Sequence, residues 1–321
     1  MYPIKRFITK FYTIALIIIA TLIVLIKFTP IDDDNYLYEY NKKIALLQHT
    51  DSPRIIFIGG SNLAFGLKSK IIEESLKHHV VNFGLHAGIG IRYLLEDALE
   101  YINKSDIVIV AAEYSNFFNG GYGNGETLTD LMLATNFRKM SLFNVQQWIE
   151  IIKKSAWFMC NSYYMSLKNQ VKKKMGRPLY DYSQYNYIAS GFNENGDEAS
   201  HYKYKGEKIY ESNERETRKV NEEFITWLDD ILKKYEGKGA RVYMMPPVCT
   251  QAVFKTVYNE NIAVALKKIN RPYLAEPSKI ALPNKYNFDG GYHVDKEGAI
   301  LNTNHILNAL SFLLDQKKGS T

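Results

Sequence analysis

The stretch "RIIFIGGSNLAFGL", residues 54–67, decides the fold. It passes from a continuous apolar run through two glycines to Ser61, and then into a segment with helical spacing. Such a run is typical of a buried parallel strand, and the glycines allow the chain to turn sharply where the strand ends. At this turn Ser61 serves either as a nucleophile or only as the N-cap of the helix behind it.

Apolar runs of the same kind recur along the chain and alternate with helical segments. The 321 residues are 46% apolar, which is ample for a packed core. The alternation predicts a doubly wound α/β domain with a mainly parallel sheet over residues 53–316. The expected strands are "RIIFIGG" (54–60), "HVVNFG" (79–84), "DIVIVAAE" (106–113) and "ARVYMMPP" (240–247).

The alternation is interrupted at about residues 117–210, where we expect an insertion of helices and irregular chain. A long irregular stretch within a compact domain is usually functional or forms a cap. Its tyrosines are suited to stacking on sugar rings while offering hydroxyl groups, and the alternative is that they only pack the insertion. These tyrosines are Tyr180, Tyr182, Tyr185, Tyr187, Tyr202 and Tyr204.

The first 28 residues have a different character from the rest. Residues 11–26 are uncharged and mostly apolar, and as a helix they span roughly 24 Å, which the flanking Lys10 and Lys27 can extend by snorkelling. A cleaved signal peptide is the alternative, although no small-residue cleavage site follows. Basic residues precede the run and acidic residues 32–34 follow it. We therefore expect a single-pass membrane anchor with a cytoplasmic N-terminus, a polar linker over 29–52 and an extracytoplasmic main domain.

Charge and cysteine content exclude other classes of protein. Four of the 40 basic residues lie in the first 28 positions, which leaves 36 basic against 34 acidic residues and gives no case for nucleic-acid binding. Cys160 and Cys249 either pair in an oxidising compartment or remain free thiols. No Cys/His cluster has metal-ligand spacing, so no metal or other cofactor is expected.

A serine nucleophile needs a base and an acid that orients the base. His293 lies in the glycine-containing loop "NFDGGYHVD" before the last helix, and Asp289 lies four residues upstream. A carboxylate and an imidazole in one loop can hydrogen-bond directly, so Ser61, His293 and Asp289 are the candidate triad. Asp295 is better explained as the N-cap of the last helix.

Three sequence blocks carry a resemblance to a known family: "FIGGSNLAFG", "VVNFGLHAGIG" and "FDGGYHVDKEGA". Together they resemble the SGNH (GDSL-type) hydrolase superfamily over residues 54–313. The chain looks most similar to the membrane-anchored envelope branch, which is related to the D-alanyl transfer protein of teichoic acid operons and to polysaccharide O-acetylation proteins. The resemblance implies a three-layer, flavodoxin-like fold and an acylated serine, with Ser61, Asp289 and His293 as the triad.

The resemblance also implies an oxyanion hole. Its donors would be the N–H of Ser61 and that of a second-block glycine, for which Gly88 is favoured and Gly84 is the fallback. The family's third block, Gly-x-Asn-Asp, should follow the third strand and supply an asparagine. This chain reads "AAEYSNFF" there.

The departure in the third block leaves the last donor open. Asn116 lies about one position beyond the expected place, whereas Glu113 and Tyr114 occupy the strand end. The third donor is Asn116, or Asn62, or absent. Several polar residues are candidates for lining a substrate groove. For His86 the alternative is burial inside the protein, and for residues 195–197 it is a simple turn. These groove candidates are Glu113, Tyr114, His86, Asp197 and His201.

These features lead to one main functional hypothesis. The protein is expected to be a membrane-anchored serine esterase or O-acyltransferase that acts on acyl groups of cell-surface polysaccharide. Its partners would be an acylated glycan or acyl donor, and a multi-spanning O-acyltransferase that delivers the donor. The alternative is a catalytically inactive, SGNH-like glycan-binding or accessory protein. A phosphate-binding "GGSN" nest is weaker, because the lysine and spacing of a P-loop are missing.

Overall fold

A computed structural model describes residues 2–31, 34–177, 187–204 and 215–318. Its centre is a sheet of four parallel strands, β1 (Arg54–Gly59), β2 (His79–Asn82), β3 (Ile107–Ala111) and β4 (Arg241–Met244), in the order β2-β1-β3-β4. The four strands fall on the four predicted apolar runs. The expectation of an α/β domain with a mainly parallel sheet is therefore confirmed.

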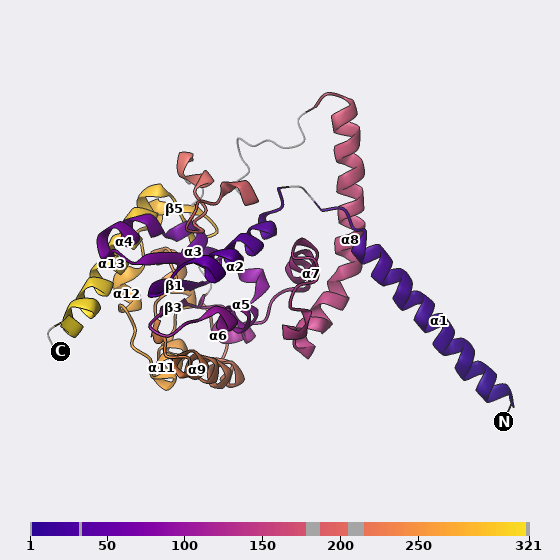
Figure 1. The fold of residues 1–321 in the computed structure, drawn as a ribbon, viewed down its shortest axis with the longest axis horizontal. Coiled ribbons are helices and arrows are strands. Elements are labelled where there is room, and N and C mark those ends of the chain that lie inside the picture. Colours follow the sequence, from indigo (N-terminus) through magenta and orange to yellow (C-terminus); the bar gives the residue numbers. More distant parts are fainter. Residues whose placement is uncertain (1, 32–33, 178–186, 205–214, 319–321) are drawn as a thin grey trace.

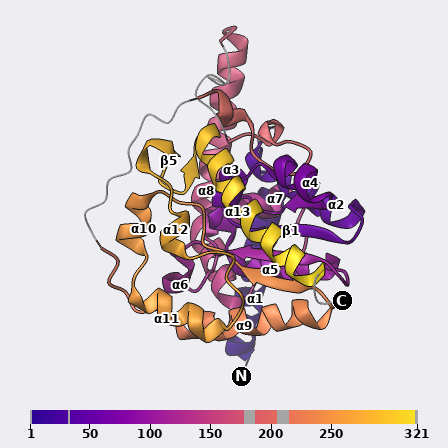
Figure 2. The ribbon, with the colours of Figure 1, turned by 90° about the vertical axis from the view of Figure 1, so that its left-hand side faces the viewer.

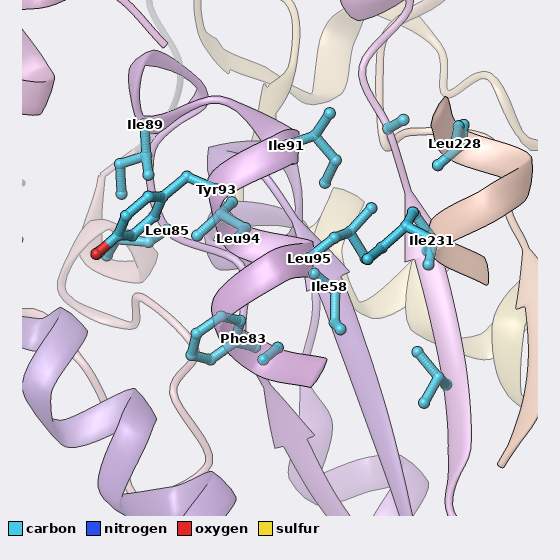
Figure 3. Packing of buried hydrophobic residues seen from close by; sticks show 14 of the residues in the cluster. Ile58, Phe83, Leu85, Ile89, Ile91, Tyr93, Leu94, Leu95, Leu228 and Ile231 are labelled. Carbon is cyan, nitrogen blue, oxygen red and sulfur yellow. The ribbon is translucent and has the colours of Figure 1, made fainter. Parts of the chain in front are cut away.

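Helices cover both faces of this sheet (Figures 1 and 2). Alternate strand residues point to opposite faces, so Ile56 and Ile58 enter one apolar cluster while Ile55 and Phe57 enter the other. Figure 3 shows the first cluster, where Ile58 packs with residues of α5 and α9. The second cluster contains residues of α4 and α13. The helices around the sheet are α2 (Glu39–His49), α3 (Ser61–Gly66), α4 (Ser69–Leu76), α5 (Ile91–Ala98), α9 (Glu222–Gly237), α10 (Gln251–Val257), α11 (Glu260–Ile269), α12 (Pro277–Ile280) and α13 (Lys296–Lys318).

A buried ion pair ties together the ends of β1 and β3 that lie opposite the glycine turn. Arg54 Nε lies 3.3 Å from Asp106 Oδ2, and both side chains are fully buried. The guanidinium also donates to the backbone carbonyls of Leu47 and Tyr101, each at 2.6 Å. Because its partners come from three segments, Arg54 fixes the start of β1 relative to α2 and the chain before β3.

Residues 29–52 are not the polar linker that was expected. Most of the segment is the short 3₁₀ helix η1 (Tyr36–Tyr38) and helix α2, and these pack into the first core cluster. Tyr40, Ile44 and Leu47 are buried at the i, i+4, i+7 spacing of one helix face. Residues 36–49 therefore belong to the main domain.

The described part of the insertion contains both helices and irregular chain, in line with the expectation. It contains α6 (Asn116–Asn119), α7 (Gly125–Ala134) and α8 (Val145–Lys174). Helix α8 begins with a capping box between Asn144 and Gln147. Tyr180, Tyr182 and Tyr185 lie outside the described residues.

Helix α1 (Tyr2–Lys27) extends away from the body of the molecule, and the C-terminal end of α1 contacts α8 (Figure 1). There the Tyr163 hydroxyl donates to the carbonyl of Phe28 at 3.0 Å. Of the helices in the described part of the chain, none combines the length and apolar character that a membrane crossing requires. The anchor expected over residues 11–26 stays a prediction.

The two cysteines are free thiols in this structure, Cys160 exposed and Cys249 buried. Burial, followed by the charge of Glu113, raises the pKa of Cys249. Of the two states left open by the sequence, the structure has the unpaired one.

Candidate functional site

Ser61 lies at the carboxyl end of β1, where the chain turns into α3. The turn consists of Gly59 and Gly60, and a methyl group on either would collide with neighbouring atoms. At Gly59 it would come within 2.8 Å of the Ala111 carbonyl, and at Gly60 within 2.5 Å of Glu113 Oε1. The glycines are therefore needed for close approach to β3, and this tight packing holds Ser61 at the sheet edge.

His293 meets Ser61 directly. Its Nε2 lies 2.7 Å from the Ser61 Oγ, which is hydrogen-bonding distance. The imidazole ring also stacks on Phe65, with ring centroids 4.3 Å apart and an angle of 17°. Residues four apart on a helix share a face, so α3 offers both the hydroxyl of Ser61 and the ring that orients His293.

Asp289 and His293 face each other across a two-stranded antiparallel hairpin of β5 (Asn287–Asp289) and β6 (His293–Val294). Gly290 and Gly291 at the tip both have positive φ, which glycine adopts without strain. The Nδ1 of His293 makes a short hydrogen bond with Asp289 Oδ1. The structure thus brings Ser61, His293 and Asp289 into one hydrogen-bonded row, and Asp295 Oδ1 caps α13 by accepting from the Gly298 N–H at 2.8 Å.

Tyr187 is a fourth member of this row that the sequence reasoning did not single out. Its hydroxyl donates to Asp289 Oδ2 at 3.0 Å and lies 3.0 Å from His293 Nδ1. The ring packs against Phe65 and Tyr36, with centroid distances of 5.3 and 5.5 Å. Only its place among the tyrosines of the insertion pointed to it, because nothing in the sequence links residue 187 to the hairpin at 289–293.

The environment of Asp289 favours its ionised form. Burial raises the pKa of this carboxyl, but the His293 hydrogen bond, the His293 charge and the Tyr187 hydroxyl together outweigh burial. The resulting pKa lies below the ordinary value of 3.8. Asp289 is therefore a carboxylate at neutral pH, as is needed to hold an imidazole whose Nε2 accepts a proton.

The two second-block glycines have their N–H groups already engaged. Gly88 donates to His86 Nδ1, and Gly84 donates to Asn82 Oδ1, both at 2.9 Å. The N–H of Ser61, by contrast, stands at the start of α3, where helical N–H groups lack intrahelical partners.

Glu113 lies beside the nucleophile turn, at the carboxyl end of β3. Its Oε1 accepts from Asn62 Nδ2 at 3.2 Å, and the Asn62 backbone N–H also bonds to the carboxyl group. Burial raises the pKa of Glu113 above 4.5, although the Asn62 bonds and the His293 charge oppose this shift. Asn116 turns its amide Nδ2 to the Glu113 carbonyl at 3.1 Å.

Three of the groove candidates lie inside the protein instead of lining a groove. Tyr114 is 1% exposed and packs against Tyr258, with ring centroids 5.2 Å apart. Asp197, 1% exposed, accepts hydrogen bonds from both the backbone and the hydroxyl of Ser69. His201 is fully buried between Glu198 and the carbonyl of Val294. The polar groups of Asp197 and His201 have internal partners, whereas the buried Tyr114 hydroxyl has none among the described residues.

Two cavities flank the second glycine block. One, of about 400 Å³, is lined by the backbone of Gly88 and by polar side chains of the insertion. The other, of about 540 Å³, adjoins the triad through Tyr187 and contains His86. Burial and then the His293 charge lower the pKa of His86 from 6.5 to about 4, so this ring is neutral at pH 7. Polar lining residues include Asn116, Asn119, Tyr122 and Gln146 in the first cavity, Asn35, Glu126, Asp130 and Lys154 in the second, and Asn124 in both.

The chemistry available at this site is proton transfer and nucleophilic attack. Among the described residues, no group of three or more His, Cys, Asp or Glu side chains is arranged to hold a metal ion. The hydrogen-bonded row instead provides a hydroxyl, a base that accepts its proton and a carboxylate that orients the base.

No protein-family model matches the chain, and no curated protein matches it either.

Proposed function

We propose that this protein is a serine esterase or O-acyltransferase of the SGNH type that acts on acyl groups of cell-surface polysaccharide. The observation that carries the proposal is the 2.7 Å contact between Ser61 Oγ and His293 Nε2, with Asp289 on the opposite ring nitrogen. The nucleophile and its base come from segments 232 residues apart. They meet at the carboxyl end of a parallel sheet, which is the edge where ligands bind in open α/β folds.

The first half of the proposed reaction forms an acyl-enzyme. His293 Nε2 accepts the Ser61 proton while the Oγ attacks the acyl carbonyl, whose electrons move onto oxygen. The Ser61 N–H lies at the start of α3, where it can donate to that oxyanion. When the intermediate collapses, the bond to the leaving oxygen breaks and His293 returns the proton to it.

The second half releases the acyl group by the same steps in reverse. A water molecule or a sugar hydroxyl gives its proton to His293 and attacks the acyl-serine. Collapse then returns the proton to Ser61. Water as the acceptor gives hydrolysis, and a sugar hydroxyl gives transfer.

The linings of the two cavities support a polyhydroxylated substrate. The first is rich in amide side chains and contains Tyr122, and these groups hydrogen-bond to hydroxyls and pack on sugar rings. The second contains Asp130, whose pKa burial raises to about 6, against the opposing Asn35 hydrogen bond. A carboxyl group in that range can accept from, or donate to, sugar hydroxyls.

The extracytoplasmic location is the part of the proposal that rests on the N-terminal charge pattern. Basic residues precede the apolar run at 11–26 and acidic residues follow it. Protease protection in membrane fractions tests this location, because an extracytoplasmic domain is digested only from the outer side.

Labelling with a fluorophosphonate probe tests the nucleophile. The full-length protein should react at Ser61, Ser61→Ala should lose this reaction, and Ser155→Ala on α8 should retain it. Peptide mapping of the labelled protein identifies the modified serine. A folded wild-type protein in which Ser61 stays unmodified would contradict the proposed chemistry.

A non-catalytic glycan-binding protein is the second candidate. The engaged N–H groups of Gly84 and Gly88 favour it, because these donors are turned to Asn82 and His86. Under this alternative, glycan binding by the wild type and by Ser61→Ala would be equal, and neither would be acylated.

A further inference from the structure

The position of Glu113 is fixed by the register of the central sheet. In the pairing of β1 with β3, Gly59 lies opposite Ala111. Ser61 and Glu113 each come two residues after these partners, at the same carboxyl edge. Glu113 therefore stands beside the nucleophile on the neighbouring strand, although the two residues are 52 positions apart in the sequence.

The contacts of Glu113 bring its carboxyl group against the backbone on both sides of Ser61. A methyl group at Gly60, before the nucleophile, would lie 2.5 Å from Glu113 Oε1. After the nucleophile, Asn62 donates to the carboxyl group through both its backbone N–H and its Nδ2. The carboxyl group thus lies at the N-terminal end of α3, where the helix N–H groups would stabilise an oxyanion on an attacked carbonyl.

An ionised Glu113 in this place would oppose the reaction. The side chain is 5% exposed, and a buried carboxylate next to a developing oxyanion would repel it. A neutral carboxylic acid has the opposite effect, since one oxygen accepts hydrogen bonds while the other carries a proton to donate. Asn62 Nδ2 donates to Oε1, so in the neutral form a proton on Oε2 would be the one to donate to the oxyanion.

Besides the Ser61 N–H, the donors nominated from the sequence are already engaged. The N–H groups of Gly88 and Gly84 bond to side chains of their own loop, and Asn116 directs its amide to the Glu113 carbonyl. We infer that Glu113, as a neutral carboxylic acid, donates the side-chain hydrogen bond to the oxyanion. This inference rests on the proposed acyl-enzyme function and adds a catalytic residue to it.

The titratable neighbours of Glu113 are consistent with this role. Burial is the largest influence on the Glu113 pKa and raises it, whereas the Asn62 bonds and the charge of His293, on β6, lower it. Cys249, which follows β4, is the other titratable group that interacts with it, and burial and then the Glu113 charge raise the pKa of its thiol. His293 is therefore the described group whose charge works against the neutral form.

Two substitutions test whether Glu113 acts as a neutral hydrogen-bond donor or as a charged carboxylate. Glu113→Gln keeps a neutral N–H donor and a similar shape, so Ser61 labelling should stay within about threefold of wild type. Glu113→Ala removes the donor, and labelling should fall about 10²- to 10³-fold. In wild type the rate should also decline as the pH rises through the Glu113 pKa, and E113Q should lack this decline. Glu276→Gln, at an exposed carboxylate, is the control for loss of charge.

An infrared difference spectrum between wild type and E113Q at neutral pH gives a readout that needs no reaction. The wild type should show the C=O band of a protonated carboxyl group, and its absence would overturn the inference. So would an E113Q rate as low as that of E113A. If instead wild-type Ser61 is never labelled, the proposed function fails while the infrared band still reports the state of Glu113.

Discussion

Tyr187→Phe is the substitution that tests most directly whether the insertion takes part in catalysis. It removes one hydroxyl, which donates to Asp289 Oδ2 at 3.0 Å and lies equally close to His293 Nδ1. The ring contacts with Phe65 and Tyr36 are kept. The change therefore isolates the hydrogen bond from the packing.

The size of the effect follows from the charge on Asp289. Hydrogen bonds to charged groups contribute about 1.5–3 kcal/mol, which is roughly 10- to 150-fold in rate if all of it is expressed in the transition state. Because the short His293–Asp289 bond remains, we expect the lower end, a fall of about tenfold in Ser61 labelling. The Tyr187 hydroxyl also lowers the Asp289 pKa, so the variant should lose activity on the acid side at a higher pH than wild type.

The assay is the rate of fluorophosphonate labelling as a function of pH, measured with unfolding curves for each variant. Tyr202→Phe is the matched control, since its hydroxyl lies in the same insertion but donates to the carbonyl of Leu67 at 3.2 Å. A Tyr187→Phe protein with a wild-type rate and an unmoved acid limb would refute the positioning role. A change in unfolding free energy alone would make Tyr187 purely structural.

Three further predictions concern the acid, the second glycine block and the sheet. Asp289→Asn should lower labelling on the order of 10³- to 10⁴-fold at an unchanged urea midpoint, because the amide no longer holds the reactive imidazole tautomer; a near-wild-type rate would exclude Asp289 from the triad. His86 is neutral in the folded protein down to about pH 4 but not in the unfolded chain, whose pKa is near 6.5. Stability should therefore fall as the pH drops from 6.5 to about 4, and His86→Gln should flatten this fall in urea titrations; an identical pH slope would contradict this. Asp106→Asn leaves the buried Arg54 charge without its partner and should cost about 3–5 kcal/mol in unfolding free energy, whereas a loss below about 1 kcal/mol would contradict the buried pairing.

The central sheet was predictable because its strands carry continuous apolar runs. A parallel strand covered on both faces has no polar alternation, so "DIVIVAAE" and "RIIFIGG" stand out against the helices between them. Residues 29–52 were misread because seven acidic and lysine residues interrupt the apolar ones. The spacing of Tyr40, Ile44 and Leu47 was the signal that predicts a packed helix there.

The site was predictable where its residues are neighbours in sequence. Asp289 and His293 share one hairpin, and Ser61 follows the first strand, so local patterns were enough to nominate them. Tyr187 reaches the site through tertiary packing, which no local pattern encodes. Glu113 was nominated from its place at a strand end, but its contact with the nucleophile turn depends on strand register. Asp197 and His201 were wrongly predicted to line a groove. In a sequence, buried polar residues with internal partners cannot be told from binding residues.

The described parts of the insertion have two different structural roles. Tyr187 bonds to the acid and base, and His201 Nε2 lies 3.0 Å from the Val294 carbonyl on the same hairpin, so residues 187–204 act as a brace for β5 and β6. The cavity linings come largely from residues 115–158. Under the proposed function, residues 115–158 would determine which substrate binds, and residues 187–204 would support proton transfer. A chimera that exchanges only residues 115–158 should therefore change the acceptor while keeping the reactivity of Ser61.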